Sequence, residues 1–186
     1  MSENKQQKQE LKTIDEALLT EEQEVNKLPS FLPGAQNPND AAAKSHVLFH
    51  KATTNAHLTE EANGPINAID LTSNNAFIAY GDKDASLVVE CSEPVEAPIG
   101  VLEVAFVQGK QRRTKFGVDY IDVDGNQKHI ADYESPGKTT NFEKYQFPEK
   151  ITGIKGIVIK FIGNSDNSPL FAVKGVRLAK DISKPL

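Results

Sequence analysis

Short apolar runs rich in β-branched residues follow one another from residue 46 to residue 180, and clusters of Gly, Pro, Asn and Asp separate them. The runs have the length of β-strands, and the separating residues are those that favour turns. Beyond residue 45 the apolar positions do not follow a helical period. Strands in close succession without intervening helices are typical of sandwiches and barrels, so the sequence predicts an all-β antiparallel fold. The expected strands span residues 47–53, 76–80, 86–91, 99–107, 114–123, 127–133, 142–147, 154–162 and 170–178.

A tight hairpin and a one-sided apolar pattern are expected within this region. Asp124-Gly125 lies between two of the runs, and a type I′ hairpin turn needs two residues that tolerate a positive φ angle. Side chains alternate between the two faces of a strand, so Leu102, Val104 and Phe106 share one face. The predicted core contains Phe77, Phe106, Phe116, Phe147, Ile159, Phe161 and Phe171.

Residues 1–45 differ from the rest of the chain and are expected to form a partly helical or extended arm. Residues 1–40 carry eight acidic and four basic side chains, and their aliphatic residues recur at helical spacing. Two interpretations remain open: a solvated disordered tail, or an arm that becomes ordered on a protein partner. The predicted division is an arm, 1–45, followed by a β-sandwich domain, 46–186. The anchors expected on the arm are Leu11, Ile14, Leu18, Phe31 and Leu32.

The charge and composition exclude several classes of protein. The formal net charge of −5 argues against nucleic acid as a partner, because such binding requires a basic face. No apolar run reaches the roughly 18 residues of a membrane-spanning helix. Residues 1–10 are polar and lack the apolar core of a secretory signal, so we expect synthesis in the cytoplasm, with incorporation into a virus particle as one further destination.

Six motifs in the β region resemble, in order, those of discoidin-like domains. These domains are the galactose-binding-like jelly rolls found in coagulation-factor C modules and in many carbohydrate-binding modules, and the similarity is to the subgroup associated with polysaccharide lyases. The resemblance implies a jelly-roll β-sandwich, with Phe77 and Phe171 in place of two signature Trp residues of the family. The motifs are Asn67-Ala68-Ile69-Asp70 with Phe77, residues 108–116, Asp124-Gly125, residues 135–139 with 143–147, residues 159–165, and residues 171–176.

The resemblance also implies a sugar site in the loops at one end of the sandwich. There an aromatic face stacks on a sugar ring, while Arg, His or Asn side chains bond to its hydroxyl groups. Two adjacent arginines could each fork onto the carboxylate of an acidic sugar, or could simply be solvated on opposite faces of the chain. The candidates are Arg112, Arg113, Tyr80, Tyr145, His57 and Asn164.

Many members of the family hold a calcium ion between an Asp of the opening loop and a Glu near the last strand. Asp70 matches that Asp, but Gly175 stands where the Glu would be. Loss of an anionic ligand weakens a calcium site, so no cofactor is expected, with calcium at Asp70 kept as an alternative. The competing interpretation is that the Asp70 carboxylate accepts backbone hydrogen bonds in its own loop.

Two hypotheses for function follow, and neither is enzymatic, because the sequence does not assemble a nucleophile, a base and an orienting group. The first is a structural or attachment protein of a larger assembly, such as a phage or virus particle, which docks by residues 1–40 onto a protein partner or a repetitive surface. The alternative is a carbohydrate-binding module or adhesin for an acidic or galactose-type polysaccharide.

Overall fold

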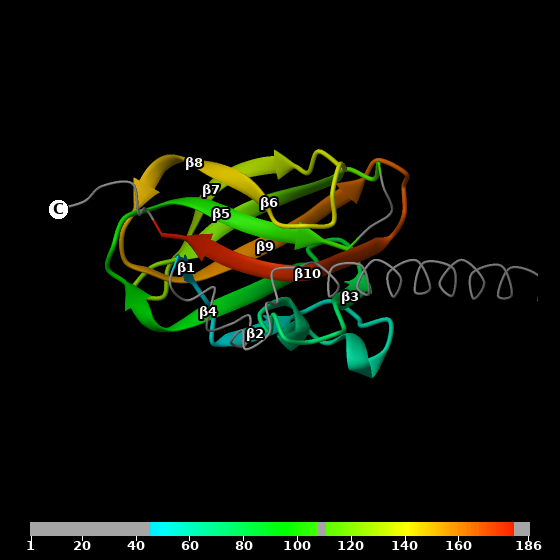
Figure 1. Ribbon diagram of the computed structural model, residues 1–186, viewed down its shortest axis with the longest axis horizontal. Coiled ribbons are helices and arrows are strands. Elements are labelled where there is room, and N and C mark those ends of the chain that lie inside the picture. The colour runs from blue at the N-terminus through cyan, green and yellow to red at the C-terminus, as the bar shows by residue number, and fades with distance from the viewer. Residues whose placement is uncertain (1–44, 108–110, 181–186) are drawn as a thin grey trace, which may run out of the picture.

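Residues 45–107 and 111–180 are described by the computed structural model, and they form two antiparallel sheets that pack face to face (Figure 1). This arrangement confirms the predicted β-sandwich. The anchors predicted on the arm, Leu11, Ile14, Leu18, Phe31 and Leu32, lie outside the described residues.

The first sheet has the strand order β1-β10-β5-β8. β1 pairs with the last residues of β10, and β3 pairs with its first residues. The second sheet has the order β2-β4-β9-β6-β7. The strands of the first sheet are β1 (His46–Val47), β3 (Phe77–Tyr80), β5 (Ile99–Phe106), β8 (Glu143–Ile151) and β10 (Leu170–Ala179). Those of the second are β2 (Lys51–Thr54), β4 (Ser86–Val95), β6 (Thr114–Ile121), β7 (Gln127–Glu134) and β9 (Ile154–Asn164).

The first predicted strand, 47–53, is two strands in the structure. β1 pairs with β10 in one sheet, whereas β2 pairs with β4 in the other. Between them Phe49 enters the core at 6% exposure, and the backbone N–H of His50 donates to the carbonyl of Glu90. The burial of Phe49 therefore marks the point where the chain crosses from one sheet to the other. The alternation of side chains along the sequence does not reveal this crossing.

The structure differs from the predicted strands in two other places, before β3 and at the end of β8. Short 3-10 helices, η1 (Glu61–Asn63) and η2 (Pro65–Ala68), precede β3, and they are too short for a periodic pattern to predict. β8 continues past Pro148, because it is an edge strand and the pairing with β5 shifts register on either side of this residue. No helix within the described residues is long and apolar enough to cross a membrane.

Aromatic side chains fill the space between the sheets. Phe77 and Phe171, at the positions of the family's tryptophans, are fully buried and meet edge to face with their ring centroids 5.4 Å apart. Phe116 is also fully buried, 5.1 Å from the ring of Phe106. The predicted core is confirmed, except that Phe161 is only partly buried and packs against the rest.

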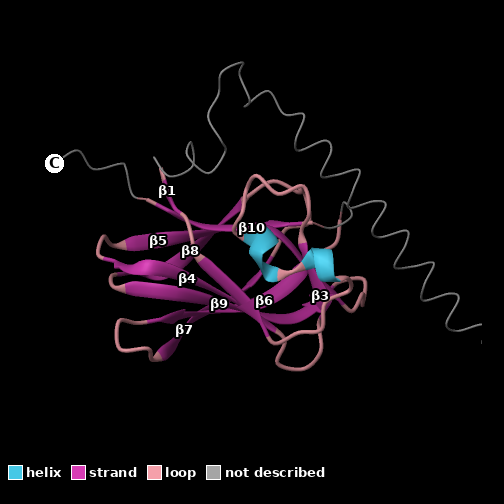
Figure 2. Cartoon of the chain, turned by 90° about the horizontal axis from the view of Figure 1, so that it is seen from below, coloured by secondary structure: helices cyan, strands magenta, loops and turns pink. Residues whose placement is uncertain are grey.

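The antiparallel order gathers the longer loops at one end of the sandwich. These loops follow β2, β3, β5, β7 and β9, and we call this end the loop end (Figure 2). The opposite end holds the short turns and both ends of the described chain, where the backbone N–H of Lys180 donates to the carbonyl of Ser45 at 2.9 Å. The strand pairing thus separates the loop end from Ser45 and Lys180 by the length of the sheets.

Candidate functional site

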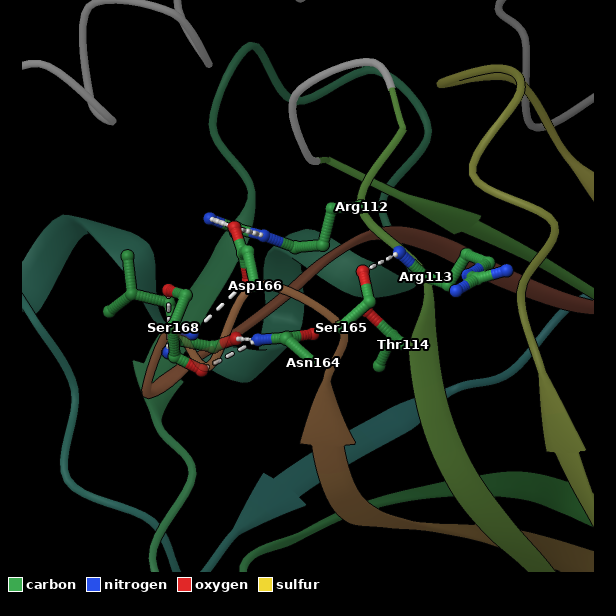
Figure 3. Close-up of polar contacts among 8 residues, drawn as sticks. Arg112, Arg113, Thr114, Asn164, Ser165, Asp166 and Ser168 are labelled. Atoms are coloured by element: carbon green, nitrogen blue, oxygen red, sulfur yellow. Dashed lines mark hydrogen bonds and ion pairs between the residues drawn. The ribbon is translucent and has the colours of Figure 1, made fainter.

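An ion pair joins two neighbouring loops at the loop end. Arg112 precedes β6, Asp166 follows β9, and both Nε and Nη2 of Arg112 lie 2.8 Å from Oδ2 of Asp166 (Figure 3). The Arg112 side chain is 11% exposed, whereas that of Asp166 is 46% exposed. Burial would raise the pKa of Asp166, but hydrogen bonds from the Ser168 backbone and from Arg112 outweigh it and hold the pKa below its ordinary value. Asp166 is therefore an oriented, accessible carboxylate.

Asn164 supports this loop rather than lying open at its surface. Its Nδ2 donates to the carbonyls of Ser168 at 2.9 Å and Leu170 at 2.8 Å, and its Oδ1 accepts from the hydroxyl of Thr114 at 2.6 Å. The Asn164 amide group therefore makes these hydrogen bonds with other groups of the protein (Figure 3). Asn164 thus holds the β9–β10 loop in shape, and its contact with a sugar stays a prediction.

The residues before β6 are also held from both sides by backbone contacts. The N–H of Ser165 donates to the carbonyl of Arg113 at 2.8 Å, and the N–H of Gln111 donates to the carbonyl of Gly137 at 2.8 Å. A Cβ at Gly137, whose φ is 67°, would lie only 2.7 Å from the carbonyl oxygen of Arg112. This close approach requires glycine, so the β7–β8 loop fixes the backbone that carries Arg112.

The two predicted arginines do not act together. Arg113 points away from Arg112, is 58% exposed, and its Nε lies 3.2 Å from Oε1 of Glu134 at the end of β7 (Figure 3). This placement matches the interpretation in which adjacent side chains leave on opposite faces. The Arg112 guanidinium alone is joined to the exposed carboxylate of Asp166.

Two more predicted residues come to the loop end from the other side. The N–H of Tyr80 donates to the carbonyl of His57 at 2.9 Å, and the next N–H, of Gly81, donates to the carbonyl of Pro169 at 2.6 Å. Tyr80 is half-buried and His57 is exposed. The β9–β10 loop therefore runs between the Tyr80 side and the Arg112 side of this surface.

Tyr145 is in the core and does not reach the surface where a sugar would stack. It is 5% exposed, and its ring lies 5.0 Å from that of Phe116 and 5.4 Å from that of Tyr133. Its hydroxyl has no hydrogen-bond partner among the described residues, and burial raises its pKa well above the ordinary value. The prediction of a binding role for Tyr145 is corrected by this burial.

The Asp70 carboxylate and its neighbouring carbonyls make hydrogen bonds within the protein. Oδ1 of Asp70 accepts the backbone N–H of Thr72 at 3.0 Å, as the competing interpretation expected. The ammonium group of Lys174 lies within hydrogen-bond distance of carbonyl oxygens in the same loop. A side chain at position 175 would meet the ring of Phe142, since a Cβ there would lie 2.4 Å from its Cζ. Across the described residues, no cluster of three His, Cys, Asp or Glu side chains could hold a metal.

A second polar cluster lies on the outer face of the second sheet, and the sequence did not predict it. Asp119 on β6 is 6% exposed, and its carboxylate lies 2.8 Å from Nζ of Lys160, 2.8 Å from Nε2 of Gln127 and 2.7 Å from Nδ1 of His129. Burial would raise the pKa of Asp119, but these hydrogen bonds and the Lys160 charge hold it below its ordinary value. The cluster ties β6 to its neighbours β7 and β9.

This depressed pKa predicts a pH dependence of stability. The contribution of Asp119 is complete above the unfolded carboxyl pKa of about 3.9 and is lost as the pH falls through the lower folded value. We expect Asp119→Asn to reduce the free energy of unfolding relative to wild type at about pH 6, and this difference should shrink progressively as the pH falls below about 3.9. Urea unfolding of both proteins at each pH measures this difference, and a gap that widens in acid would contradict the assignment.

The sequence analysis did not predict a role for Asp166 or Ser168, although the residues around them form a recognisable turn pattern. Residues 164–168 read Asn-Ser-Asp-Asn-Ser, a cluster of side chains that cap their own backbone in turns. Asp166 does so, because its Oδ1 accepts the N–H of Ser168 at 3.1 Å. The pattern predicts a turn, but it does not reveal that the turn meets Arg112 from a loop more than fifty residues away.

Comparison with solved structures places the fold among carbohydrate-binding modules. The CBM32 module of AlyQ in complex with 4,5-unsaturated mannuronic acid is 21% identical, with a TM-score of 0.60, over 72% of this chain and 96% of that one. A pectin-binding module is 18% identical, with a TM-score of 0.61, over 75% and 96% of the two chains. The family 32 module of NanJ from C. perfringens, in complex with galactose, is 15% identical, with a TM-score of 0.58, over 73% and 98%.

At these identities the likeness establishes the fold. An F5/8 type C domain is among the similar structures, so the discoidin-like β-sandwich indicated by the sequence motifs is confirmed. No protein-family model matches the chain, and no curated protein matches its sequence. The three similar structures described above are carbohydrate-binding modules.

Proposed function

We propose that the protein is a non-catalytic carbohydrate-binding module whose glycan site is the loop end around Asp166. The observation that carries this proposal is the carboxylate of Asp166, 46% exposed and fixed by Arg112 through two contacts of 2.8 Å. The solved modules of the same fold, some of them in complex with sugars, support it. The attachment hypothesis depends on residues 1–40, which lie outside the described residues.

The chemistry of this surface favours a neutral, galactose-type sugar over an acidic one. A sugar ring offers adjacent hydroxyl groups that each donate and accept hydrogen bonds, and a fixed carboxylate is a strong acceptor for them. Arg112 is largely covered and already paired, so the accessible charge is the negative one on Asp166. A uronate carboxylate would be repelled there. Tyr80 and His57 supply ring surface on the other side of the β9–β10 loop.

The test is binding to galactan and to alginate, measured by affinity electrophoresis and calorimetry. Loss of a hydrogen bond to a charged group costs about 1.5–3 kcal/mol, so Asp166→Asn is expected to weaken galactan binding about tenfold or more. The matched control is Arg113→Met, which removes an exposed charge on the side facing away, and it is expected to bind as wild type does. The absence of galactan binding by the wild-type protein, or unchanged affinity in Asp166→Asn, would contradict this site.

A further inference from the structure

The loop between η2 and β3 turns its backbone carbonyls toward one point. The N–H of Ser73 donates to the carbonyl of Asp70 at 3.0 Å, and the N–H of Asn75 donates to the hydroxyl of Ser73 at 3.1 Å. That hydroxyl in turn donates to Oδ1 of Asn67, a buried residue, at 2.7 Å. These bonds close the loop tightly and bring the carbonyls of Ser73 and Asn75 near each other.

Lys174 reaches this point from the neighbouring strand. Its Nζ donates to the carbonyl of Ser73 at 2.6 Å and to that of Asn75 at 3.2 Å. In β10, Val173 pairs with Phe106 and Gly175 pairs with Ala105, so Lys174 is the extra residue of a β-bulge. A bulge leaves its extra residue out of the ladder and redirects the side chain, which here aims the lysine at the loop.

We propose that the Lys174 ammonium group is a permanent internal cation of this loop, so that the loop keeps its shape without a divalent metal ion. An ammonium group carries three donors and a positive charge, which suits a cluster of carbonyl oxygens as a hard cation does. It also repels a second cation from the same oxygens. The loop is thereby stabilised by the chain itself, at any calcium concentration.

The surroundings of Gly175 give independent support, because a side chain at this position would collide with apolar side chains unless they moved. A Cβ at this position would lie 2.4 Å from Cζ of Phe142 and 3.3 Å from a methyl carbon of Leu71. The Phe142 ring is itself held by the guanidinium of Arg177, 3.8 Å from its centroid. The side that would supply an anionic ligand is thus packed with apolar groups.

Two measurements on the full chain test this proposal. The melting temperature of the wild-type protein is expected to be the same in excess chelator and in millimolar calcium, since a ligand that binds only the native state would raise it. In Lys174→Met, which keeps the aliphatic stem and removes the charge, we expect a lower melting temperature. Amide hydrogen exchange should also accelerate at Thr72, Ser73 and Asn75, while the central strands keep their protection.

The matched control is Lys115→Met, which removes the charge of an exposed lysine on β6 and should change neither quantity. A calcium-dependent rise in the wild-type melting temperature would overturn the proposal, and it is measurable even if Lys174→Met does not fold. Exchange at the loop amides that is as slow in Lys174→Met as in wild type would overturn it as well. Neither readout depends on glycan binding, so the proposed function is tested separately.

Discussion

Glu103→Ala is expected to reduce the free energy of unfolding by about 3–5 kcal/mol, because it breaks a buried ion pair by removing one partner. Glu103 is 4% exposed on β5. Its Oε1 accepts from Nη2 of Arg177 at 3.0 Å, and its Oε2 lies 3.0 Å from Nε2 of His46. The substitution leaves Arg177, whose side chain is only 19% exposed, without its carboxylate partner.

Urea unfolding monitored by circular dichroism measures this loss. The conservative control is Glu103→Gln, which keeps the shape and an acceptor oxygen and should lose substantially less. A further comparison is the double variant Glu103→Leu with Arg177→Leu, which removes both charges and should recover part of the stability. If Glu103→Ala unfolds at the same urea concentration as wild type, the pair contributes nothing and its role in joining β1, β5 and β10 is refuted.

Phe116→Ala is expected to cost a similar amount, about 3–5 kcal/mol, through a cavity in the middle of the core. The ring of Phe116 is fully buried and lies 5.0 to 5.8 Å from the rings of Phe106, Tyr133 and Tyr145. Phe106 lies on β5 and Tyr145 on β8 of the first sheet, and Tyr133 lies on β7 of the second, so the ring of Phe116 fills space between the two sheets.

The same unfolding measurement applies, with Val123→Ala as the control. Val123 is 61% exposed in the β6–β7 turn, and shortening it should change stability by less than about 0.5 kcal/mol. Phe116→Leu should lie between the two. A destabilisation by Phe116→Ala no larger than that of Val123→Ala would show that the aromatic cluster is not the centre of the core.

The strands were predictable because their determinants are local. Turn residues stand at nearly every strand end, and the predicted 114–123 and 154–162 differ from β6 and β9 by only a few residues. The alternation of side chains also contained the correct answer for Tyr145. Lys144 and Gln146 are exposed on β8, so Tyr145 shares the buried face with Phe147. The family resemblance instead led to the prediction that Tyr145 binds sugar at the surface.

The candidate site was less predictable because its contacts join distant parts of the chain. The motif that contains Asn164 pointed to the β9–β10 loop. Which side chains hold that loop and which face solvent depends on contacts with the carbonyls of Ser168 and Leu170, and the motif does not show these. Lys174 is a similar case. A lysine followed by a glycine within an apolar strand is typical of a bulge, yet nothing local indicates that the lysine meets the carbonyl of Ser73.

The pairing of β1 with β10 determines how the sandwich would respond to mechanical load applied through the residues that flank it. Ser45 and Lys180 face each other across the β1–β10 pair, so a force that separates them would open this pair one hydrogen bond at a time, like a zipper. A force between the loop end and Lys180 instead acts along β10, and the hydrogen bonds from β10 to β5 and β3 resist it together. Load applied through a ligand at the loops would therefore be shared among these hydrogen bonds.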